Sequence, residues 1–125
     1  MFQKLAGLVL AGALGTLARY ELAGFVHRIN RASFPWGTVT VNVTGCFLVG
    51  LLWMLFENRW PVSQETRLVI LVGFMGAFTT FSTLILETSE LLRSSEWMHA
   101  AANVAMQNGI GFVALLAGAA LGRMI

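Results

Sequence analysis

The sequence predicts an all-α membrane protein with four transmembrane helices, the third of which is broken near its centre. Hydrophobic residues make up 57% of the chain and charged residues 11%, about half the charged share of a soluble domain. Four apolar windows each approach the roughly 20 residues that cross a bilayer. Together they occupy most of the 125 residues and leave only short connections, so we expect a single domain over 1–125.

The first window runs from Leu5 to about Phe25. Gly7, Gly12 and Gly15 lie on one helical face, and small residues let membrane helices approach closely. Arg19 follows one turn later. Its side chain either reaches the lipid headgroups or forms a fixed positive charge in a vestibule that attracts anions. A cleaved signal peptide is not expected, because three further apolar windows follow.

The second window, Gly37–Phe56, contains no charged residue and follows Pro35 and Trp36, a turn and an interfacial aromatic. Asn42 lies inside this window, where an unpartnered amide is costly. Two roles for it stay open. It can form a hydrogen bond with a neighbouring helix, or its two N–H donors can bind an anion.

The third window, Leu68–Leu86, is interrupted by Gly73-Phe74-Met75-Gly76-Ala77-Phe78-Thr79-Thr80-Phe81-Ser82-Thr83. A glycine inside a helix costs about 1 kcal/mol relative to alanine, so this segment is a poor continuous helix. Irregular backbone at membrane depth is tolerated only where it is buried in protein or lines a cavity. Broken helices in transporters form ion and substrate sites. We therefore expect the break to carry the function.

A polar track is predicted to follow the break. Thr79, Thr83 and Glu87 are spaced four residues apart, which would place them on one helical face, with Ser82 beside them. Phe81 lies in the middle of this track, and the positive edge of an aromatic ring favours an anion. The environment of Glu87 stays open between a position outside the pore, pairing with an arginine, and protonation.

The fourth window, Ala100–Leu121, is free of charge but contains Asn103, Gln107 and Asn108. Asn103 and Gln107 are one turn apart and share a face. Their amides can point toward either a partner helix or a pore. Before this window we expect a charged, amphipathic connection over Glu90–His99.

Basic residues are distributed evenly between the two predicted sides of the membrane. Each side has four: Lys4, Arg59, Arg67 and Arg123 on the side of the termini, and Arg19, Arg28, Arg31 and Arg93 on the other. Orientation follows the difference between sides, and here the difference is zero. The chain is therefore predicted to insert both ways and to form an antiparallel homodimer. A net charge of +2 is too small and scattered to indicate nucleic-acid binding.

Three motifs cover the first three windows: Gly12-x-x-Gly15-x-x-x-Arg19-Tyr20, Gly37-Thr38-x-x-Val41-Asn42-x-x-Gly45-x-x-x-x-Gly50 and Gly73-Phe74-x-Gly76-x-x-Thr79-Thr80-Phe81-Ser82-Thr83-x-x-x-Glu87. On these motifs the chain resembles the Fluc (CrcB-type) fluoride channel family over essentially its whole length. The third motif is the most specific in order and spacing.

The resemblance implies a four-helix, dual-topology homodimer with two antiparallel fluoride pores. It also implies a structural sodium ion (Na+) at the centre of the dimer, held by backbone carbonyls at the break. By motif position these carbonyls belong to Gly76 and Thr79. Backbone oxygens suit a hard cation, and unwound helix supplies them.

The resemblance further implies a fluoride pathway, with a vestibule or structural role for Arg19 at the end of the first helix. The pathway residues by motif position are Asn42, Phe81, Ser82, Thr83 and Glu87. The chain departs from the family at Leu84, where many members have a second pore phenylalanine. Leucine lacks the ring quadrupole, so we expect this position to alter conduction or affinity.

The predicted function is a passive fluoride channel, not an enzyme, in the plasma (inner) membrane of a prokaryote. Fluoride enters cells as HF and is trapped as the anion, so a leak for the anion suffices for export. The alternative is a small multidrug-resistance-like, proton-coupled exporter, which needs a carboxylate embedded in the membrane. Glu21 lies at the boundary of the first window, and Glu87 is the other candidate. A purely structural membrane subunit is a third class, against which the hydroxyl track argues.

Overall fold

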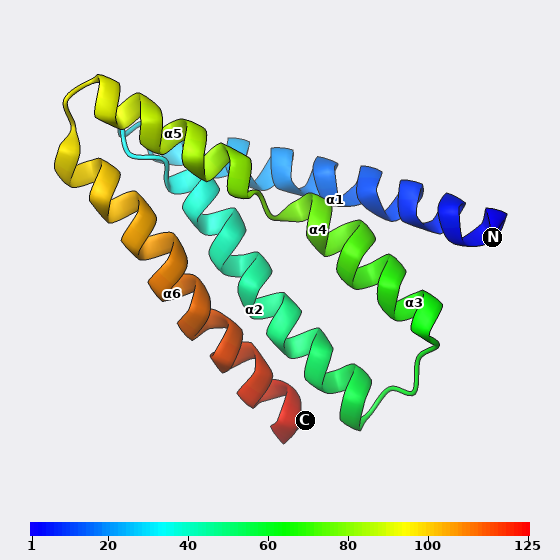
Figure 1. The fold of residues 1–125 in the computed structure, drawn as a ribbon. Helices are drawn as coiled ribbons and strands as arrows, with labels where there is room; N and C mark the ends of the chain where they lie inside the picture. The colour runs from blue at the N-terminus through cyan, green and yellow to red at the C-terminus, as the bar shows by residue number, and fades with distance from the viewer.

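The computed structural model describes all 125 residues as helices joined by short connections (Figure 1). In chain order the helices are α1 (Phe2–Ile29), α2 (Trp36–Asn58), α3 (Gln64–Leu68), η1 (Val69–Phe74, π-helical), α4 (Met75–Phe78), α5 (Phe81–Arg93) and α6 (Trp97–Met124). The segments from α3 to α5 form one span, Gln64–Arg93. Four helices are thus long and apolar enough to cross a membrane, which confirms the four predicted spans.

The helices extend beyond the apolar windows at both ends, because polar residues continue the helix after the hydropathy falls. The predicted connection over Glu90–His99 is therefore wrong, since α5 continues to Arg93 and α6 begins at Trp97. The turn between them closes on Ser95, which has a φ of 60°. Its amide donates to Leu92 and the next amide to Leu91, the hydrogen-bond pair of a Schellman turn.

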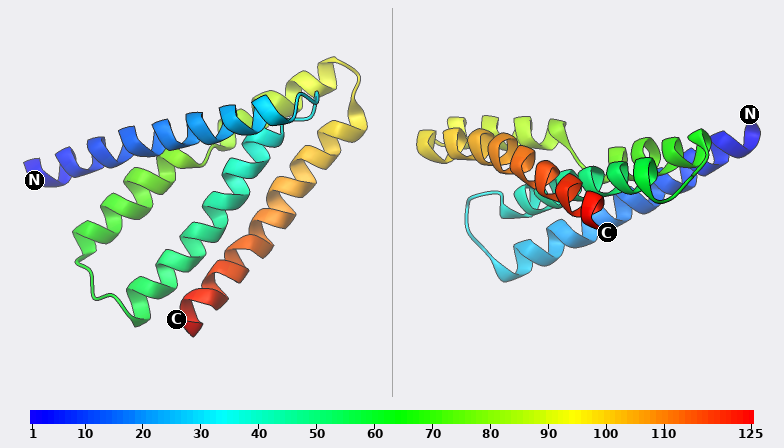
Figure 2. Two further views of the ribbon diagram at one scale, coloured as in Figure 1. Left: turned by 180° about the vertical axis from the view of Figure 1, so that it is seen from behind. Right: turned by 90° about the horizontal axis from the view of Figure 1, so that it is seen from below.

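The helices α2 and α6 run side by side along most of their length (Figure 2). Glycines allow this close approach. A Cβ added at Gly118 would meet the carbonyl oxygen of Phe47, and one added at Gly50 would meet that of Leu115. The backbones of the two helices therefore pack directly against each other.

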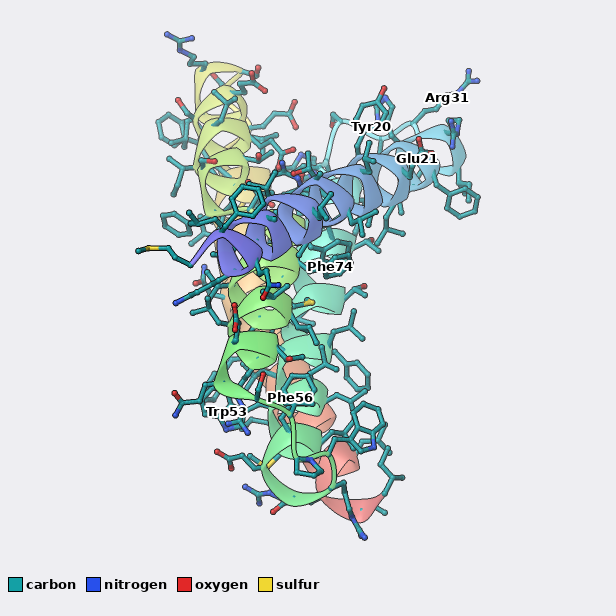
Figure 3. The ribbon with its side chains drawn as sticks, turned by 90° about the vertical axis from the view of Figure 1, so that its right-hand side faces the viewer. Tyr20, Glu21, Arg31, Trp53, Phe56 and Phe74 are labelled. Carbon is teal, nitrogen blue, oxygen red and sulfur yellow. The ribbon has the colours of Figure 1, made fainter.

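The helix α1 crosses the other spans obliquely (Figure 1) and packs on η1 and α4. Its predicted small face forms this interface, because a Cβ added at Gly15 would meet the Phe74 carbonyl group and one at Gly7 would lie 3.1 Å from Val69. In Figure 3, Phe74 lies beneath α1. The glycine stripe thus positions the first half of the third span.

A small core of Val41, Met75 and Phe78 packs α4 against α2. Only 21 of 125 residues are buried, and many large apolar side chains face outward, as expected where lipid replaces water around the helices. Directly after this core, Thr79 and Thr80 adopt extended backbone and bend the third span. The sequence predicts an interruption within residues 73–83, and the structure has it at these two threonines.

Candidate functional site

The bend between α4 and α5 is closed by local hydrogen bonds of its own threonines. Thr79 has ψ 157° and Thr80 has ψ 114°, so the helical ladder stops after the Thr79 amide donates to Met75. The Thr80 hydroxyl oxygen accepts from the Thr83 amide at 3.3 Å and donates to the Thr83 hydroxyl at 2.9 Å. Thr80 is therefore the N-cap of α5, which explains one of the hydroxyls in the motif.

The Asn42 side chain pairs with the backbone that the bend leaves without helical partners. Its Oδ1 accepts from the Thr80 amide at 2.8 Å, and its Nδ2 donates to the Thr80 carbonyl at 2.9 Å. Its Nδ2 also donates to Gln107 Oε1 at 2.6 Å. Of the two roles left open by the sequence, the structural one is present within the single chain.

A chain of amides extends from Asn42 across α6 to α5. Gln107 donates to Asn103 at 2.8 Å, Asn103 donates to the Thr88 hydroxyl at 3.0 Å, and Thr88 donates to the Leu84 carbonyl at 2.7 Å. Asn103 is fully buried and Gln107 nearly so. These two amides therefore point toward partner helices.

Asn108 takes no part in this chain. It is exposed and donates to the Val104 carbonyl of its own helix. The register between α6 and α2 is not predicted by the sequence; in the structure Gln107 faces Asn42 and Asn108 is exposed.

The predicted common face of Thr79, Thr83 and Glu87 is wrong. Thr79 precedes α5, and its hydroxyl donates to the Met75 carbonyl at 3.0 Å, the frequent i−4 bond of membrane threonines. The spacing argument fails because it assumes continuous helix across the bend. Thr83 and Glu87 do line one pocket together.

Glu87 bonds to a hydroxyl rather than to an arginine. Its Oε1 accepts from Thr38 Oγ1 at 2.6 Å, and its Oε2 is buried without a hydrogen-bond partner. The only ion pair in the chain joins His99 to Glu96, so pairing of Glu87 with an arginine is wrong. The sequence contains Thr38 in its second motif, but nothing there indicates this contact.

An open pocket of about 710 Å³ lies between α1, the start of α2 and α5. Its polar lining is mixed: cationic Arg19 and Arg28 with His27, hydroxyls of Thr38, Thr80 and Thr83, and carboxylates of Glu21 and Glu87. Neither arginine forms an ion pair. Arg19 lies within α1, which continues to Ile29, and it lines the pocket as a vestibule role requires.

Figure 3 shows where this pocket's α1 residues come from. Tyr20 and Glu21 lie on the C-terminal half of α1, with Arg31 beyond them near the following connection. Arg31 does not line the pocket, so the cationic lining comes from α1 itself.

Phe81 and Ser82 lie on the outer surface of the single chain. The Phe81 side chain is 71% exposed, and it lines a second pocket of about 270 Å³ together with Asn42, Gln107 and Leu84. The expectation that Phe81 stands inside a continuous track is therefore not met within one chain. Thr80 lines both pockets, whereas Asn42 lines only the second, so Thr80 lies between the two.

Gly76 and Thr79 present backbone oxygens near the bend. Gly76 is exposed, and a Cβ added there would meet no atom within 4 Å. Carbonyls in the last turn of a helix lack helical donors, and such oxygens suit a hard cation. One chain offers two of these carbonyls, fewer than the six or so ligands that hard cations usually take.

Comparisons with known proteins cover the whole chain. The family model described as "CrcB-like protein, Camphor Resistance (CrcB)" matches residues 6–119. A protein of Desulforapulum autotrophicum named "Fluoride-specific ion channel FluC" is 60% identical over 125 residues, which is all of both chains. Proteins of the same name from Nitrosococcus oceani and Solidesulfovibrio magneticus are each 51% identical over 125 residues, again all of both chains.

Proposed function

This multi-pass membrane chain belongs to the CrcB family, and we propose that it is a fluoride-selective channel that passively exports cytosolic fluoride. The observation that carries the proposal is the 60% identity, over the full length of both chains, to a protein named as a fluoride-specific ion channel. We place the chain in the plasma membrane of a prokaryote, where a leak for the anion lowers the fluoride trapped in the cytosol.

Fluoride reaches the pathway through the 710 Å³ pocket. Unpaired Arg19 and Arg28 raise the local concentration of anions there. Fluoride is small and strongly hydrated, so a narrow passage has to replace its water with several donors. The Thr83 hydroxyl on the pocket wall is such a donor, because it accepts from Thr80 and keeps its own proton. The Thr38 hydroxyl, in contrast, already donates to Glu87.

The passage continues past the Asn42–Thr80 pair into the second pocket. Asn42 Nδ2 donates to Gln107 at 2.6 Å, and fluoride takes the place of this acceptor as it passes. Phe81 then presents a ring edge of positive potential. Leu84 is buried and lines the same pocket, where it supplies only apolar bulk.

The channel is an antiparallel homodimer with two pores and a structural Na+ at its centre. The bend supports this assembly, because Gly76 is exposed and its surroundings are open. A two-fold axis at the bend would double the carbonyls of Gly76 and Thr79 to four oxygen ligands. When bound, the ion supplies a positive charge that neutralises the carbonyl ends of two α4 helices.

The proton-coupled exporter is not favoured. Its mechanism needs a carboxylate embedded in the first span, and Glu21 is exposed in the C-terminal half of α1. Glu87 is the remaining candidate, and it is already bonded to Thr38.

Anion efflux from liposomes tests the proposal. Purified protein is reconstituted, valinomycin dissipates the potential, and electrodes record fluoride and chloride. Rapid loss of fluoride with chloride retained is the expected result. Flux that requires an imposed proton gradient and is abolished by Glu87→Gln would replace the channel with the exporter.

A further inference from the structure

Arg67 is held in a fixed position at the start of the third span. Its Nη2 donates to the Phe56 carbonyl at 2.9 Å. Its guanidinium lies 5.9 Å from the centroids of the Trp53 and Phe56 rings, within cation–π range. Figure 3 shows these two rings close together on α2. The side chain is thereby positioned before any ligand arrives.

The charge of Arg67 has no acidic partner. Glu57 and Glu65 are nearby in sequence, but neither forms an ion pair with it. A guanidinium has five N–H donors, and the structure gives Arg67 one hydrogen bond. Its planar fork matches the geometry of a phosphate.

An apolar groove of about 520 Å³ begins at Arg67. Its lining is Trp53, Val62, Gln64, Arg67, Leu68, Leu71 and Val72. Val72 is five residues further along the span than Arg67, within the π-helical segment η1 and more than one helical turn deeper. The groove therefore starts at a cation near the end of the span and continues along apolar side chains toward the middle of the membrane.

Exposed tryptophans mark this end of the span as a membrane interface. Trp53 and Trp60 expose 45% and 53% of their surfaces, and tryptophan is enriched at the level of the lipid headgroups. Arg67 thus lies at the depth where lipid phosphates are found.

We propose that this groove binds an anionic phospholipid, with the lipid phosphate on Arg67 and an acyl chain along Leu68 and Val72. Charge complementarity favours an anionic lipid, because the cation has no carboxylate of its own. The apolar lining suits an acyl chain rather than a soluble anion. The site is separate from the fluoride pathway and does not depend on it.

Native mass spectrometry of the full chain in detergent tests the site. Phosphatidylglycerol is added to delipidated protein, and adducts per chain are compared with those formed with phosphatidylcholine. We expect one preferred phosphatidylglycerol per chain. Arg67→Gln should weaken its binding about fivefold, the equivalent of about 1 kcal/mol for one arginine at the membrane surface.

The matched control is Arg59→Gln. Arg59 is exposed, lies in the connection just before α3 and does not line the groove, so its loss should leave phosphatidylglycerol binding unchanged. Equal losses in both variants would mean diffuse surface attraction and would overturn the site. Equal binding of the two lipids by the unmodified protein would overturn it as well.

Val72→Trp tests the groove without touching the charge. Val72 is 60% exposed, so a larger side chain can be accommodated there, and it should block the acyl chain and reduce adducts severalfold. Val113→Trp, at a similarly exposed position of α6, is its control. If Arg67→Gln instead separates the dimer and leaves lipid adducts unchanged, the groove is a subunit interface and the proposal is wrong.

Discussion

Asn42 supplies to Thr80 the two hydrogen bonds that a continuous helix would have supplied. A buried amide or carbonyl without a partner costs about 1–3 kcal/mol, and the bend would leave both on the same residue. One carboxamide satisfies both, because it presents a donor and an acceptor side by side. The geometry of Asn42 therefore stabilises the bend, whether or not an anion also uses it.

Asn42→Asp should both destabilise the bend at Thr80 and reduce the passage of fluoride. The carboxylate keeps the acceptor for the Thr80 amide but loses the donors to the Thr80 carbonyl and to Gln107, and it repels an anion. We expect fluoride efflux to fall at least tenfold, with a lower melting temperature in detergent. Efflux and thermal melting are measured on the same preparation, with Asn58→Asp as control at an exposed position that lines neither pocket. Unchanged efflux would remove Asn42 from the pathway.

Phe81→Ile separates conduction from folding. The ring is largely exposed in the chain, so its loss should cost little stability, while removing the quadrupole that favours an anion. Fluoride efflux is expected to fall several-fold, with the elution volume of the purified protein unchanged. Ile85→Val, at a half-exposed position of the same helix, should conduct normally. Full fluoride efflux by the Phe81→Ile variant would remove the ring from the fluoride pathway.

At the scale of elements, hydropathy predicts what crosses the membrane but not how the spans meet. The windows located four helices because burial in lipid depends on composition. The hydrogen bond between Thr38 and Glu87 joins α2 to α5, and the Gln107–Asn42 bond joins α6 to α2. Such pairs depend on rotation of each helix about its axis, and single-sequence periodicity does not fix that rotation when most faces are apolar.

The α2–α6 interface leaves no room for a larger side chain at Gly50 or Gly118. A Cβ at Gly118 would meet the Phe47 backbone, so Gly118→Ala forces two helices apart, and overpacking of this kind costs about 1–3 kcal/mol. A lower melting temperature is expected from a fluorescence-detected melt in detergent. Gly109→Ala lies in the same helix with open space around it and should leave the melting temperature unchanged or higher. Equal melting of the two variants would contradict this packing.

At the scale of the molecule, the even distribution of basic residues remains a prediction about assembly. The structure places both termini and the connection before α3 at one end, and the other two connections at the opposite end (Figure 1). The four basic residues assigned to each side therefore do lie toward opposite ends of the bundle. In the proposed assembly, antiparallel insertion of a second copy would bring the Gly76 and Thr79 carbonyls of two chains together and offer four oxygen ligands.

Adding lysines on only one side of the membrane should abolish fluoride conduction. Co-expression with a variant that carries added lysines on the other side should restore it. Gln3→Lys with Asn58→Lys adds two cations on the side of the termini, and Ala32→Lys with Ser94→Lys adds two on the other; all four positions are exposed. Each double variant should insert in one orientation and, without an antiparallel partner, lose most fluoride efflux from liposomes made with its purified protein. Co-expression of the two should restore it. Gln3→Lys with Ala32→Lys keeps the balance and should conduct normally, whereas full efflux by either unbalanced variant alone would mean that the dimer is not antiparallel.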